Sequence, residues 1–100
     1  MFGILSKTRQ EVRDKMVYLE VYAENKVSYR VTSGITDGKA GEVITYGIEA
    51  EDRLSGEKEI ISDFSRNIED AVDFAEMLIK GRIRPRQIYG KALNYLSFTI

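Results

Sequence analysis

Five carboxylates in the middle of the chain have the residue type and spacing that come nearest to a catalytic or metal-binding set. Glu49, Glu51 and Asp52 fall at the end of one predicted strand, and Glu57 and Glu59 begin the next. Strand pairing would bring them close together, and a bound Mg²⁺ or Ca²⁺ would relieve their mutual repulsion. No cation-binding loop pattern accompanies them. The prediction is therefore that they hold no metal and that none of them is catalytic.

Two residue types that carry most enzyme chemistry are missing. The sequence contains no cysteine and no histidine, which excludes disulfides, thiol nucleophiles, Ser–His–Asp and Cys–His mechanisms, and zinc sites built from either ligand. The glycine-containing stretch 37–41 lacks the spacing and the terminal Lys-Ser/Thr pair of a phosphate-binding loop. We therefore predict a protein that is not an enzyme and that needs no cofactor.

A basic cluster follows the first predicted helix. It consists of Lys80, Arg82, Arg84, Arg86 and Lys91. Arginine suits bidentate contacts to phosphate or carboxylate, and the helix that begins near the following proline adds a positive dipole end. These residues are candidates for binding a partner or an anion. The alternative reading is a solvated loop between two helices, whose cations satisfy carbonyls at a helix end.

Four apolar or aromatic side chains are candidates for a protein interface. Phe74 and Met77 lie on the helical wheel away from the predicted core stripe, beside an acidic face, and an exposed pair of this kind favours a protein contact. Tyr18 and Tyr22 share one strand face with glutamates. Because a base-stacking sheet places basic residues beside its aromatic residues, an interface explains these tyrosines better than nucleic-acid stacking.

Charge is distributed unevenly along the chain. Residues 1–41 carry seven basic and five acidic side chains, residues 42–76 carry three and eleven, and residues 77–100 carry five and none. The total of −1 therefore conceals an acidic middle and a basic end. Opposite charges of this kind allow the basic end of one copy to meet the acidic middle of another under two-fold symmetry.

The hydrophobic pattern changes from a period of two to a helical period near residue 65. Alternation predicts strands over Met16–Glu24, Val27–Ser33, Glu42–Glu51 and Glu57–Phe64, with a mobile loop over Gly34–Gly41. Helical spacing predicts a helix capped by Ser65 or Asn67 and ending at Gly81, and a second helix from Pro85 to Ser97. In the third strand, the side chains predicted to face the core are Ile44, Tyr46, Ile48 and Ala50. In the fourth, Ile60 and Phe64 are placed on one face and Ile61 on the other.

These elements predict one α+β domain over residues 16–100, preceded by a polar arm or short helix over residues 1–15. Hydrophobic residues make up 43% of the chain and charged residues 31%, as in an ordinary globular domain. The fold class that follows is a four-stranded antiparallel sheet with two C-terminal helices packed on one face.

The segment from Tyr29 to Leu96 resembles a family of small proteins of unknown function from clostridia and related Firmicutes. The resemblance rests on Tyr29-Arg30, the run 46–49 (Tyr-Gly-Ile-Glu), the run 61–65 (Ile-Ser-Asp-Phe-Ser) and the proline-initiated helix. The Gly34–Gly41 loop is longer than the family pattern, and the final helix lacks acidic residues near its end. The resemblance implies a bacterial, phage or mobile-element protein and supplies no activity.

Taken together, the residues favour a non-enzymatic protein-binding regulator or inhibitor whose partner is another protein or a second copy. The alternatives are a nucleic-acid-binding protein that uses the Lys80–Lys91 cluster, or a phage or mobile-element inhibitor of a nucleic-acid enzyme such as a CRISPR effector. No apolar run approaches the roughly 20 residues of a membrane span, and the short apolar start 1–5 does not follow a basic region. We therefore expect a cytoplasmic protein without a membrane partner.

Overall fold

The computed structural model describes residues 11–99. Along this part of the chain, four strands are followed by two helices. The elements are β1 (Arg13–Tyr22), β2 (Val27–Gly38), β3 (Gly41–Asp52), β4 (Lys58–Ser65), α2 (Ile68–Lys80) and α3 (Pro85–Thr99).

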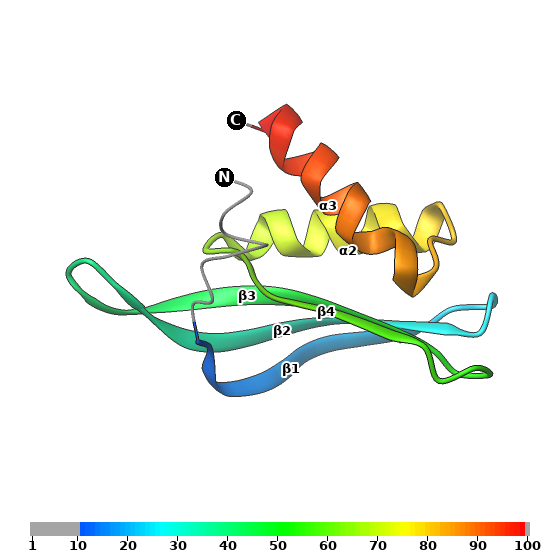
Figure 1. The fold of residues 1–100 in the computed structure, drawn as a ribbon, viewed down its shortest axis with the longest axis horizontal. Helices are drawn as coiled ribbons and strands as arrows, with labels where there is room; N and C mark the ends of the chain where they lie inside the picture. The colour runs from blue at the N-terminus through cyan, green and yellow to red at the C-terminus, as the bar shows by residue number, and fades with distance from the viewer. Residues whose placement is uncertain (1–10, 100) are drawn as a thin grey trace.

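The strands form one antiparallel sheet in the order β1-β2-β3-β4, and both helices lie on the same face of it (Figure 1). Helix α2 contacts β2, β3 and β4, whereas α3 contacts β3 and β4. This arrangement confirms the predicted fold class. It also places the two helices away from β1, which forms one edge of the sheet.

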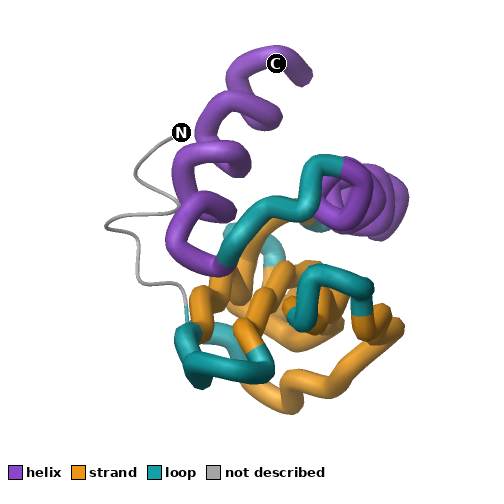
Figure 2. The backbone as a smooth tube through the Cα atoms, turned by 90° about the vertical axis from the view of Figure 1, so that its right-hand side faces the viewer, coloured by secondary structure: helices purple, strands orange, loops and turns teal. Residues whose placement is uncertain are grey.

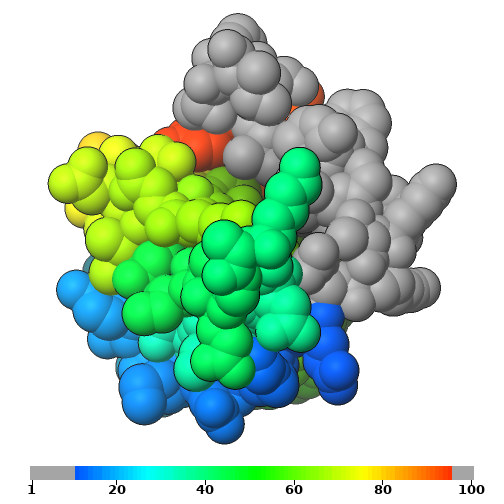
Figure 3. Space-filling model, turned by 90° about the vertical axis from the view of Figure 1, so that its left-hand side faces the viewer, coloured from blue at the N-terminus to red at the C-terminus, as the bar shows by residue number. Residues whose placement is uncertain are grey.

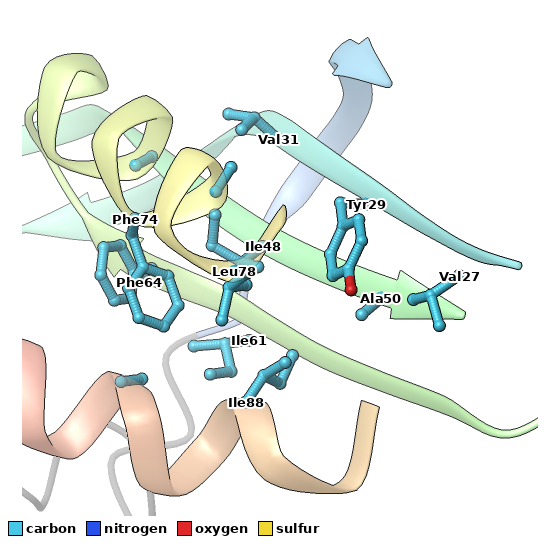
Figure 4. Close-up of a cluster of buried hydrophobic side chains, with 13 residues drawn as sticks. Val27, Tyr29, Val31, Ile48, Ala50, Ile61, Phe64, Phe74, Leu78 and Ile88 are labelled. Carbon is cyan, nitrogen blue, oxygen red and sulfur yellow. The ribbon is translucent and has the colours of Figure 1, made fainter. Parts of the chain in front are cut away.

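The core lies between the sheet and the helices (Figure 4). Phe64 of β4 stacks on Phe74 of α2 with ring centroids 4.7 Å apart, and Tyr95 of α3 tilts against both rings. Phe74 is 0% exposed, so its predicted place in an exposed patch is wrong. The predicted core stripe of this helix was Ile68, Ala71, Val72, Ala75, Leu78 and Ile79. Helix α2 is rotated from it so that Ala71, Phe74, Ala75 and Leu78 are buried, because the stacked ring gives this face more apolar area.

The loop predicted over Gly34–Gly41 is also wrong, because most of it belongs to the sheet. β2 and β3 continue to Gly38 and Gly41, which pair across a two-residue turn. A side chain at Gly34 would meet Val12 Cγ1 at 2.4 Å, so the glycine is required where the start of β1 crosses it. Figure 3 views the molecule from this end, with the tip of the hairpin between β1 and the start of α2.

A bulge in β4 explains the misassigned faces of that strand. The register with β3 shifts between Tyr46 and Ile48, which inserts extra residues into β4. Ile61 and Phe64 consequently both face the core, while Ile60 is exposed. A side chain at Gly47 would lie 2.6 Å from the carbonyl oxygen of Ile61, which confirms that this glycine marks a close backbone approach.

Two other expectations are corrected at the sheet ends. Ile44 was expected in the core but is exposed, because the hairpin extends beyond the helices there. β1 begins at Arg13, inside the predicted polar arm, since Arg13 forms ion pairs with Asp37 (3.2 Å) and Glu42 (3.0 Å). The prediction for residues 1–10 lies outside the described residues.

Candidate functional site

Two of the central carboxylates, Glu49 and Glu51, form ion pairs with an arginine and do not surround a metal position. On the sheet face opposite the helices, Arg30 forms ion pairs with Glu20 (2.5 Å), Glu49 (3.4 Å) and Glu51 (3.1 Å). Lys15 adds a contact of 3.3 Å to Glu49. Among residues 11–99 no group of three or more acidic side chains is placed to hold a metal ion.

The charge of Arg30 is firmly maintained by these neighbours. Desolvation through partial burial lowers its pKa, but hydrogen bonds with Glu51 and Glu20 and the charges of Glu20 and Glu49 outweigh that effect. The pKa of Arg30 is therefore above its ordinary value. Each of the three carboxylates contacts Arg30, and Glu49 also contacts Lys15, so the network ties three strands together.

The structure divides the predicted basic cluster into two kinds of residue. Arg84 donates to Asp52 Oδ2 at 2.7 Å and to the Asn25 carbonyl at 3.3 Å, and Arg86 lies 3.5 Å from Glu57. Arg84 fastens the α2–α3 loop, and Arg86 the start of α3, to the turns of the sheet. Two others, Lys80 and Arg82, are exposed and form no ion pair with a described residue, and the same holds for the more distant Lys91 on α3.

Asp52 anchors one of these turns. Hydrogen bonds from the backbone N–H groups of Leu54 (2.9 Å) and Ser55 (3.1 Å) are the main reason that its pKa is lowered. Burial acts in the opposite direction, and the positive charge of Arg84 adds to the lowering. The ionised carboxylate therefore holds both its own turn and the arginine that fastens the helices to it.

The end of α2 places Arg82 in an uncommon backbone conformation. The Ile83 N–H donates to the Leu78 carbonyl and the Arg82 N–H to the Ile79 carbonyl, which is the hydrogen-bond pattern of a Schellman motif. In this motif the position of Arg82 is left-handed and is usually glycine. Arg82 has φ 52°, and the loop is fixed further by a 2.6 Å hydrogen bond from the Tyr29 hydroxyl to the Ile83 carbonyl.

Three turns meet at this end of the molecule, which Figure 2 shows facing the viewer. The Arg53 N–H donates to the Lys26 carbonyl at 2.8 Å, and the Arg53 guanidinium donates to the Ala23 carbonyl at 2.8 Å. The same guanidinium lies 5.2 Å from the centre of the Tyr22 ring. We call the exposed cations gathered here the basic corner; they are Lys26, Arg53, Lys80 and Arg82.

A groove of about 380 Å³ opens beside the basic corner. One wall is formed by residues 22–25 around the β1–β2 turn, and the other by Ile79, Lys80 and Arg82 at the end of α2. The lining of the groove therefore combines the apolar Ala23 and Ile79 with the cations Lys80 and Arg82. Tyr22, which also lines it, is the last residue of β1.

The strongest apolar feature of the surface is β1 itself. Its exposed apolar and aromatic side chains, here called the edge surface, are Met16, Val17, Tyr18, Val21 and Tyr22. The predicted interface residues Tyr18 and Tyr22 are 56% and 63% exposed. Met77, also predicted there, is 39% exposed on α2, where it lines a separate shallow groove with Asp73 and Glu76. The structure thus leaves Tyr18 and Tyr22 exposed on one strand and Met77 apart on α2, and it buries Phe74.

The sequence did not identify Lys26 and Arg53 as site residues. They are separated by a whole hairpin and meet only because β1–β2 and β3–β4 turn at the same end of the sheet. A usable signal was present for Lys26, because only residues 25–26 separate the strands predicted over Met16–Glu24 and Val27–Ser33, and a two-residue hairpin turn requires left-handed residues. None was present for Arg53.

Comparison of the chain with protein-family models, with curated proteins and with solved structures found no match in any of the three. The resemblance to the clostridial family therefore stays a prediction. Within residues 11–99, neither helix has the length and apolar character needed to cross a membrane.

Proposed function

We propose that this protein is a non-enzymatic protein-binding module, a cytoplasmic regulator or inhibitor that acts by contact, and that its partner binds the edge surface of β1. The observation that carries the proposal is the location of the exposed apolar side chains. Of the nine large apolar side chains that are exposed among the described residues, five belong to this one strand.

The position of β1 makes this exposure significant. β1 is an edge strand, and no described strand pairs with its outer side. Its outward backbone N–H and C=O groups are open to a further strand, and proteins normally protect such edges with charges or cover them. Here apolar side chains stand on both faces of the strand, because Val17 and Tyr22 pair with open-face residues and Val21 pairs with the core residue Tyr29. An added strand would bury these side chains as well as pair the backbone.

The shape of β1 favours a short extended segment of another protein over a second, identical β1. The strand has two register shifts, between Arg13 and Met16 and between Val17 and Leu19, and Asp14 has φ 53°. Such irregularities interrupt long regular pairing between two edges. A short segment can pair its backbone with the regular stretch from Leu19 to Tyr22 while its next side chains contact the exposed Val17 and Tyr18. Self-association is the alternative outcome of the test.

The contacts of the basic cluster do not support nucleic acid as the partner. Two of its five cations, Arg84 and Arg86, are ion-paired with Asp52 and Glu57. Glu20 lies among the aromatic residues of the edge surface, and its carboxylate accepts a hydrogen bond from the Tyr22 hydroxyl. A surface that stacks bases places basic residues beside its aromatic residues, whereas here a carboxylate lies beside them.

The test is selection of phage-displayed random decapeptides on the immobilised full chain. We expect peptides with alternating apolar residues to be enriched, and the double variant Val17→Lys/Tyr18→Lys to bind them about tenfold more weakly. Leu54→Lys is the matched control, because Leu54 is equally apolar and 79% exposed but lies in the β3–β4 turn. Thermal unfolding verifies that both variants fold. Equal binding by the wild type and the double variant would remove β1 as the site, and light scattering on the free protein reports self-association.

A further inference from the structure

The basic corner lies where a partner segment bound along β1 would leave the strand. Tyr22 ends β1 and also lines the groove beside Lys80 and Arg82. The edge surface and the groove are therefore one continuous surface, apolar along the strand and positively charged at the end. Glu24 is the one acidic side chain that lines the groove, opposite these two cations.

The corner is rigid before anything binds. The Arg84 side chain joins the α2–α3 loop to the β1–β2 turn through the Asn25 carbonyl and to the β3–β4 turn through Asp52. The Asn25 amide donates to the Tyr29 hydroxyl at 3.1 Å, and that hydroxyl donates in turn to the Ile83 carbonyl. Because the three turns are fastened to one another, the corner cations project from a backbone that needs no reordering on binding.

Two of the corner cations have a left-handed backbone, a conformation that disfavours any residue with a side chain. Three residues other than glycine have positive φ among the described residues, and two of these are Lys26 (φ 67°) and Arg82 (φ 52°). A left-handed backbone is disfavoured for residues with a long side chain, and glycine or asparagine would relieve it. Neither cation is paired with a described acidic side chain. Their charges are therefore not used in an ion pair within the described residues and are open to an acidic partner.

We infer that the basic corner binds the acidic end of the extended partner segment, so that the partner of this protein is an alternating apolar strand that ends in glutamates or aspartates. This inference rests on the proposed function of β1. Apolar side chains bury against the edge surface, and the carboxylates beyond them enter the groove between Tyr22 and Arg82. The corner thereby selects among the many apolar strands that would otherwise pair with an open edge.

The decapeptide selection tests this inference separately from the proposed function. On the wild type we expect acidic residues to be enriched at one end of the alternating apolar stretch. A synthetic peptide of that selected sequence should bind about fivefold more tightly than its Glu→Gln counterpart at low salt, by fluorescence anisotropy. In Arg82→Gly, which relieves the left-handed strain and keeps the fold, this preference should fall to below about twofold.

Two controls make the result specific. Arg82→Lys keeps the charge and should keep the preference, and Lys39→Ala removes an exposed cation from the β2–β3 turn at the other end of the sheet and should leave it unchanged. Enrichment of apolar peptides without an acidic end would overturn the inference while sustaining the proposed function, and no enrichment at all would overturn both. Binding of a dT oligonucleotide that Arg82→Gly weakens to the same extent would also overturn it, because the corner would then select any polyanion.

Discussion

The sheet has two edge strands, β1 and β4, and the helices cover only β4. β4 lies against both helices and supplies Ile61 and Phe64 to the core. β1 carries six apolar or aromatic side chains against three in β4, yet five of the six are exposed. An apolar residue on an edge strand is therefore not in itself a sign of either core or interface. What decides between them is which edge the helices cover, and here that coverage ends at β2.

The same difference separates stability from recognition. Each aromatic ring at the β4 edge packs on other rings of the core, whereas the rings at the β1 edge face solvent or, for Tyr22, a guanidinium. Substitutions at β4 and under α2 should consequently unfold the protein, while substitutions of the same chemistry at β1 should leave the fold intact.

The largest expected effect comes from the buried ring of α2. Phe74→Ala removes a fully buried ring that stacks on Phe64, and we expect the free energy of unfolding to fall by about 3–5 kcal/mol. Tyr18→Ala removes an aromatic ring of similar size from the exposed edge and should change it by less than about 1 kcal/mol. Urea denaturation measures both. Similar losses in the two variants would mean that β1 is part of the core and would end the comparison.

Much of the fold follows from local patterns in the sequence. The alternation over β1 to β4, the switch to helical spacing, the Asn67 cap and the proline at the start of α3 all act over a few residues, and each was predicted. The cap is confirmed by the Asn67 side chain, which accepts from the Glu69 N–H. The packing of both helices on one face of the sheet could also be predicted, because two amphipathic helices must cover one apolar sheet face.

What escaped prediction depends on contacts between distant residues. Phe74 is in the core because α2 turns toward the ring of Phe64, and part of the 34–41 stretch pairs with the start of β1, where Arg13 also reaches Asp37 and Glu42. The site divides in the same way. Tyr18 and Tyr22 were found from their strand pattern, whereas Arg53 joins Lys26 through the topology of the sheet.

A second prediction concerns the turn that joins β3 to the covered edge. Because the folded-state pKa of Asp52 is lowered, its ionised form contributes stability above the unfolded pKa of about 3.9, and this contribution is lost as the pH falls through the folded value. Asp52→Asn should therefore be less stable than the wild type at pH 7, and the difference should shrink in acid. Asp37→Asn, at the exposed hairpin tip, is the control. A stability difference for Asp52→Asn that is independent of pH would contradict the assigned role of its charge.

The smallest expected effect is an increase in the free energy of unfolding, at the end of α2 beside the open edge. Arg82 occupies the left-handed position of the Schellman motif, so Arg82→Gly should raise the free energy of unfolding by about 0.5–1 kcal/mol, the relief of strain being partly offset by the greater freedom of glycine in the unfolded chain. Gly56→Ala is the converse control, because Gly56 has φ 82° and alanine there should destabilise. Thermal and urea unfolding give both values. If Arg82→Gly were instead destabilising, the arginine side chain would stabilise the fold. The end of α2 would then belong with the covered edge, which stabilises the protein, and not with the edge that recognises a partner.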